Sequence, residues 1–184
     1  MRVFYSGMIA LAVLAGCVTV NEVETGLSNA SKRDYLDYVG GKGPILITAV
    51  NAPFSEGADQ ATEAAVRFAG QSITTVSFTD EKAKAHQPHF RIVMVFDLPV
   101  TMSDRDICKA DTEGAPVERV TGEMRVFSVF CAREEQLSGT LVRGPAPKTA
   151  AAPDYEKILR AAFENMFPLN DTEASDEDPL RRRR

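Results

Sequence analysis

The segment 90–98 (FRIVMVFDL) alternates its side chains more regularly than any other part of this chain. Every second position is apolar along one face, which carries Phe90, Ile92, Met94, Phe96 and Leu98. The opposite face carries Arg91, Val93, Val95 and Asp97, so its charges stand only at the two ends. A period of two is typical of a β-strand. The segment therefore predicts a β-strand, which Pro99 ends.

Further strands and two helices are predicted around this strand. The apolar run 45–50 predicts a strand that is covered on both faces and is therefore central in its sheet. The segments 73–78, 123–133 and 137–143 predict three more strands, the last two as a hairpin. Helical spacing of apolar residues predicts helices at 58–69 and 153–167. The second helix has a stripe of Tyr155, Ile158, Leu159, Ala162 and Met166. The order predicts one α+β domain over 44–168, with two helices on one face of a four- or five-stranded, mainly antiparallel sheet.

The first 17 residues predict an export signal. Arg2 precedes an apolar run over 3–14, which is too short to span a membrane as a helix. Its ending, Leu14-Ala15-Gly16-Cys17, resembles the lipobox of bacterial lipoproteins. This resemblance implies that 1–16 is a signal peptide and that Cys17 is acylated. The sequence alone leaves open an ordinary cleaved signal peptide or a hydrophobic N-terminal anchor.

Two flanking segments are predicted to lie outside the folded domain. The segment 17–43 is polar and rich in small residues, which predicts a lipidated N-terminus and a tether. Within it, 34–38 predicts a helical turn that lays Tyr35 and Tyr38 on the domain. The segment 169–184 holds five acidic residues followed by Arg181–Arg184 and predicts a disordered, charged tail.

The three cysteines divide into one for the lipid and two for each other. With Cys17 acylated, Cys108 and Cys131 remain, and an oxidising compartment favours a disulfide between them. Closing this loop would stabilise the fold by about 3 kcal/mol in the chain-entropy model. The alternative is a pair of buried free thiols, since cysteine packs as a small apolar side chain.

No residue pattern predicts a catalytic or metal site. His86 and His89 are the only histidines, and a zinc site needs three or four ligands. Asp104, Asp106 and Asp111 lack the spacing and the glycine of a helix-loop-helix calcium site. There is no Gly-x-Ser-x-Gly motif for a hydrolase. The net charge of −5 argues against nucleic-acid binding. We expect no cofactor and no small-molecule substrate.

The chain resembles small uncharacterised lipoproteins of Gram-negative bacteria. The features that carry this likeness are Gly-Gly-Lys-Gly-Pro at 40–44, Ala-Pro-Phe at 52–54 and Phe130-Cys131. The element order and the lipid anchor are similar to those of small α/β outer-membrane lipoproteins, including auxiliary lipoproteins of envelope export machines. Val18 in place of Asp after Cys17 implies, on this resemblance, sorting to the outer membrane.

The expectation is therefore a non-enzymatic binding or assembly module that is anchored in the outer membrane and faces the periplasm. It contacts the bilayer through acylated Cys17 and meets an envelope protein at a sheet edge or on the open sheet face. The alternative is a small cell-wall or envelope hydrolase.

Overall fold

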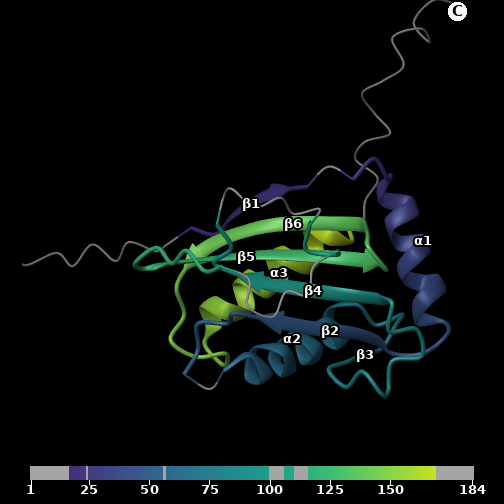
Figure 1. Cartoon of the computed structure of the whole chain (residues 1–184), viewed down its shortest axis with the longest axis horizontal. Coiled ribbons are helices and arrows are strands. Elements are labelled where there is room, and N and C mark those ends of the chain that lie inside the picture. The colour runs from purple at the N-terminus through teal and green to yellow at the C-terminus, as the bar shows by residue number, and fades with distance from the viewer. Residues whose placement is uncertain (1–16, 24, 56, 100–105, 110–115, 169–184) are drawn as a thin grey trace, which may run out of the picture.

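A computed structural model describes residues 17–23, 25–55, 57–99, 106–109 and 116–168. These described residues form three helices and a six-stranded sheet (Figure 1). The strands are β1 (Thr19–Glu22), β2 (Ile45–Val50), β3 (Phe78–Thr79), β4 (Phe90–Phe96), β5 (Glu123–Ala132) and β6 (Glu135–Pro145). The helices are α1 (Asn29–Gly40), α2 (Ala58–Ser72) and α3 (Pro153–Met166).

The sheet is mixed, with the order β1-β6-β5-β4-β2-β3. The pairs β1–β6, β6–β5 and β5–β4 are antiparallel, whereas β2 runs parallel to both β4 and β3. The prediction of four or five mainly antiparallel strands therefore needs correction to a six-stranded α/β arrangement. The sixth strand is β1, which lies in the segment predicted as a tether. The parallel pairing follows from α2, because a strand that is followed by a crossover helix is paired in parallel by the next strand.

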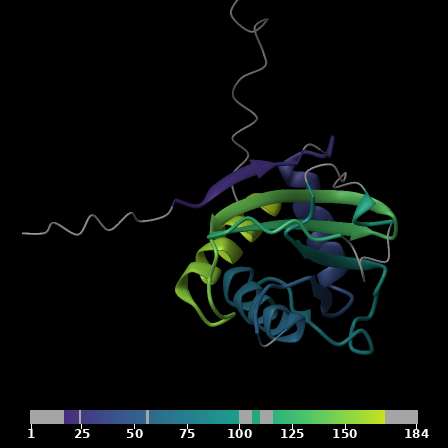
Figure 2. The ribbon, with the colours of Figure 1, turned by 60° about the vertical axis from the view of Figure 1, so that its left-hand side comes forward.

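Both predicted helices, α2 and α3, pack on the same face of the sheet, as Figure 2 shows. All five residues of the predicted stripe on α3 are buried there, and Tyr155 also donates its hydroxyl to the Ala61 carbonyl of α2 at 3.2 Å. The alanine-rich face of α2 buries Ala61, Ala65 and Ala69 completely. The helix continues to Ser72, so the strand predicted at 73–78 shrinks to the two residues of β3.

Described residues of the connector between β4 and β5 pack on the other face of the sheet. The apolar side chains on this face of the sheet are those of Val93, Val95, Phe127, Val129, Cys131 and Leu141. They pack with Leu98, Ile107 and Cys108 of the connector. Leu98 was predicted to share one face of the strand with Ile92, Met94 and Phe96, which lie in the helix-side core. Asp97 has a positive φ of 52°, which ends the alternation of β4 and turns Leu98 to the connector face.

The segment 17–43 differs most from its prediction. It was expected to be a tether, yet it contains β1 and α1. The N-cap Ser28 accepts a hydrogen bond from the Ser31 amide, which starts α1, and Leu36 and Val39 are buried in the helix-side core. The two tyrosines do not lie on the domain, because Tyr35 is 40% exposed and Tyr38 is 57% exposed.

Candidate functional site

The candidate site is the N-terminal attachment, where Cys17 joins the folded domain. Cys17 is exposed, and β1 begins two residues after it. Val18 is partly buried against the helix-side core. Its Cγ2 contacts Gly144 closely, since it lies 3.2 Å from the point where a Cβ would stand if Gly144 carried a side chain. From there β1 pairs with β6, starting at Thr19 opposite Arg143. The chain is thus fixed to the sheet almost immediately after the predicted lipid attachment.

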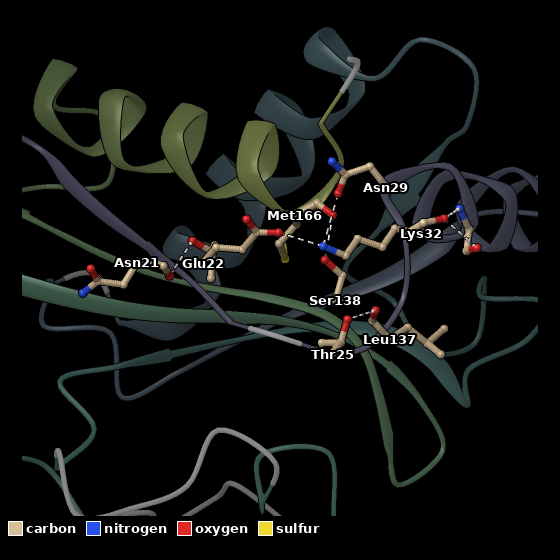
Figure 3. Close-up of polar contacts among 11 residues, drawn as sticks. Asn21, Glu22, Thr25, Asn29, Lys32, Leu137, Ser138 and Met166 are labelled. Carbon is tan, nitrogen blue, oxygen red and sulfur yellow. Dashed lines mark hydrogen bonds and ion pairs between the residues drawn. The ribbon is translucent and has the colours of Figure 1, made fainter. Parts of the chain in front are cut away.

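An ion pair between a buried lysine and a half-exposed glutamate joins α1 to β1. The Nζ of Lys32 lies 2.8 Å from Oε1 of Glu22 and 3.4 Å from Oδ1 of Asn29 (Figure 3). The Lys32 side chain is only 4% exposed, whereas the Glu22 side chain is 49% exposed. A buried ammonium without an acidic partner is costly, so the Lys32 side chain requires Glu22 to stay beside it.

Further hydrogen bonds join the same segment to β6 and to the end of α3. Thr25 donates its hydroxyl to the Leu137 carbonyl at 3.1 Å, and Arg33 donates to the Pro168 carbonyl at 2.7 Å. Beneath Lys32, Ser138 of β6 donates to the Met166 carbonyl at 2.6 Å, which satisfies a group at the C-terminal end of α3 (Figure 3). These contacts place the N-terminal segment within the fold.

The disulfide predicted between Cys108 and Cys131 is confirmed. The two sulfur atoms are 2.06 Å apart, the Cα atoms are 5.6 Å apart, and both residues are buried. Arg91 adds a second fastening, because its Nη2 donates to the Cys108 carbonyl at 3.0 Å. The bridge therefore fixes residues 106–109 of the connector to the C-terminal end of β5, on the sheet face that α2 and α3 do not cover.

The histidines and aspartates that the sequence analysis considered and rejected as metal ligands do not come together among the described residues. His86 is exposed and packs against Gly43, whereas His89 is partly buried and stacks on Phe90. Asp106 lies 3.9 Å from Lys109, and Asp104 and Asp111 fall outside the described residues, as does Arg181–Arg184. In the part of the chain that the structure describes, no three histidine, cysteine or acidic side chains group as metal ligands.

A buried carboxylate at the end of β4 was not predicted as a site. Burial raises the pKa of Asp97, while the Arg125 amide and the Arg125 and Arg119 guanidinium groups oppose this shift. The amide of Arg125 donates to Asp97 Oδ1 at 3.1 Å, and the Glu118 amide donates to the Asp97 carbonyl at 2.7 Å. Asp97 thus holds the returning end of the connector against β5. Its sequence signal was weak, since it resembles any charge that ends a strand.

Two open hollows lie on the helical side of the molecule. One of about 400 Å³ lies on the outer face of α1 and is lined by Ser31, Asp34, Tyr35 and Tyr38. The other, of about 600 Å³, lies between α2 and α3, where Arg160 stands over the Phe68 ring between Glu156 and Glu164. Both acids in the second hollow are solvent-exposed and interact with Arg160.

Comparison with known proteins gives no family for the chain: no protein-family model, no curated protein and no solved structure matches it. Within the described ranges, none of the helices has the length and apolar character needed to cross a membrane.

Proposed function

We propose that the chain is a lipid-anchored, non-enzymatic binding or assembly module of the bacterial outer membrane that faces the periplasm. One observation carries this proposal. Cys108 and Cys131 form a disulfide, as expected for a protein in an oxidising compartment, and Cys17 stands exposed at the start of an edge strand. A pair of bridged cysteines and a separate exposed one is the division that an acylated Cys17 requires.

The short distance between Cys17 and β1 supports a close attachment to the bilayer. Several acyl chains anchor a protein stably, whereas one chain binds only marginally. With Val18 packed into the core and Thr19 already paired, an acylated Cys17 holds the edge of the sheet near the membrane surface. The module therefore works as a fixed body on the membrane, not as a domain on a long tether.

The outer face of α1 is the surface we propose for the envelope partner. The strand β1 runs along the sheet towards α1, so this helix lies at the opposite end from Cys17 (Figure 1). Tyr35 and Tyr38 are exposed there beside Asp34, and tyrosine is enriched in protein–protein interfaces because it combines apolar area with a polar end.

The anchor is tested by the variant Cys17→Ala expressed with its signal segment. We expect the variant to leave the membrane fraction and to lack lipid mass on its N-terminal peptide, while Cys108–Cys131 still forms. Membrane association that is unchanged in Cys17→Ala, together with an unmodified N-terminal peptide in the wild type, would contradict the anchor.

The binding role is tested by a photo-crosslinking residue placed at position 38 in living cells. We expect one defined envelope protein to be captured from position 38 and not from the exposed position 63 on α2, and we expect Cys17→Ala to reduce the yield. Cleavage of purified cell-wall material by the chain would instead support the hydrolase alternative and contradict the non-enzymatic role.

A further inference from the structure

Two arginines lie side by side on the sheet near Cys17. Arg125 of β5 is directly opposite Arg143 of β6, and Arg143 is directly opposite Thr19 of β1. Val126 and Val142 point into the helix-side core, so their neighbours Arg125 and Arg143 face the other side of the sheet. Both guanidinium groups therefore belong to the face that α2 and α3 do not cover.

The end of the sheet around Arg125 and Arg143 is called the rim below. Most of the acidic residues there already form hydrogen bonds or ion pairs. Arg125 is 4% exposed and donates through Nη2 to the Glu118 carbonyl, and the same Nη2 lies 3.8 Å from the Glu118 carboxylate. Asp97 accepts from the Arg125 amide and lies 3.8 Å from Nε of Arg119. Glu123 lies two positions before Arg125 on the same face of β5, so the formal charges of Asp97, Glu118 and Glu123 balance those of Arg119, Arg125 and Arg143.

Arg143 differs from Arg119 and Arg125 because it forms no ion pair with a described residue. Its Nε is buried and, within the described part of the chain, has no hydrogen-bond partner. The Nε of Arg125 is buried and unpartnered as well. Leaving a guanidinium N–H buried and unpaired is costly, so an anionic group that reaches this position gains a strong, charge-assisted hydrogen bond.

The position of Arg143 specifies which anion can reach it. Cys17 is two residues before Thr19, and two residues span at most about 7 Å. Acyl chains on Cys17 that enter a bilayer therefore bring Arg143 to the depth of the lipid phosphates. A guanidinium binds a phosphate through two parallel N–H donors, which an ammonium does not do.

We propose that Arg143 binds the phosphate of a phospholipid headgroup and so orients the anchored domain with α1 directed away from the membrane. This inference rests on the proposed anchor at Cys17. The anchor supplies the affinity, because it holds the rim at a high effective concentration of headgroups. Because the acidic and basic side chains of the rim balance in formal charge, the rim as a whole is not attracted to the membrane. Arg143 therefore contributes to the orientation of the domain and not to its membrane affinity.

The test uses the full chain, purified from bacterial membranes with its N-terminal modification, in nanodiscs of phosphatidylcholine and phosphatidylglycerol. A gadolinium-chelating lipid broadens the amide signals of residues that lie near the membrane. We expect strong broadening at Arg143 and Thr19 and little at Tyr35 and Tyr38. Arg143→Gln should reduce the preference for this orientation about five-fold. Arg143→Lys should have an intermediate effect, and Arg67→Gln, which removes an exposed charge from α2, should have none.

The outcomes separate the two proposals. A chain that carries lipid on Cys17 but shows equal broadening of α1 and of the rim overturns the headgroup site and leaves the anchor in place. An orientation that is the same in Arg143→Gln as in the wild type, with an unchanged melting temperature, also overturns it. A chain without lipid on Cys17 overturns the anchor and the headgroup site together.

Discussion

Two segments with little regular pattern in the sequence are 17–43 and the connector 100–122, and their described residues are held to the sheet by different means. The first is held by non-covalent contacts, namely the Lys32–Glu22 ion pair, the β1–β6 pairing and the buried Leu36 and Val39. In the second segment, the described residues 106–109 are held by the Cys108–Cys131 bridge. Residues 116–122 are held by a backbone hydrogen bond to Asp97 and by the hydrogen bond from the Arg125 side chain of β5 to the Glu118 carbonyl.

This difference predicts how the stability of the domain changes when the contacts of each segment are removed. A covalent bridge lowers the entropy of the unfolded chain, and its loss is felt by the whole domain. An ion pair with one buried partner instead carries a local desolvation cost, so its loss depends on which partner is removed. The two kinds of fastening are therefore distinguishable by mutation.

The largest effect is expected from removing the bridge. The double variant Cys108→Ala, Cys131→Ala should lower the free energy of unfolding by about 2–5 kcal/mol. Urea unfolding of the oxidised wild type and of the variant measures this difference. A matched comparison is Leu159→Ala, which empties a fully packed site on the other face of the sheet and should cost a similar 2–5 kcal/mol. A bridge variant as stable as the wild type would mean that Asp97 and Ile107 alone hold the connector.

A smaller and asymmetric effect is expected at the ion pair. Glu22→Gln leaves the buried Lys32 ammonium without its carboxylate, and because Glu22 is half exposed we expect a loss of about 2 kcal/mol. Lys32→Met replaces the buried charge by an apolar chain of similar length and should cost less than 1 kcal/mol. Equal losses in these two variants, measured by urea unfolding, would contradict a desolvation-controlled fastening.

The smallest effect is expected at Asp97, through pH. Burial raises the pKa of this carboxyl in the folded state, so the folded protein binds the proton more tightly than the unfolded chain does. The resulting stabilisation is present below the unfolded pKa and is lost as pH rises through the folded pKa. The stability of Asp97→Asn relative to the wild type should therefore increase from acidic to neutral pH. A relative stability that falls over this range would show that hydrogen bonds to the carboxylate outweigh its burial.

The sequence predicted those elements whose own pattern identifies them. The alternation in β4 as far as Phe96, the strand β5, the apolar stripe of α3 and the pairing of the two late cysteines are confirmed. These features depend on short-range periodicity or on simple chemistry, which a single sequence carries.

The N-terminal segment could not be predicted in the same way. In α1 only Leu36 and Val39 are buried apolar residues, and the buried Lys32 is a charge that a sequence pattern assigns to solvent. The strand β1 has four residues and gains its stability from pairing with β6, which lies more than a hundred residues later. Likewise, the parallel pairing of β2 with β4 and the turn of Leu98 at Asp97 depend on tertiary contacts.

The central claim is that the residue predicted to carry the lipid is joined directly to a rigid domain. The most direct measurement is the backbone amide order parameter of Val18, Val20 and Glu22 in the purified chain, compared with β6. The account predicts values of about 0.85 in both strands, as in rigid backbone. Values below about 0.6 in 18–22, with β6 remaining rigid, would show a flexible tether and contradict the claim.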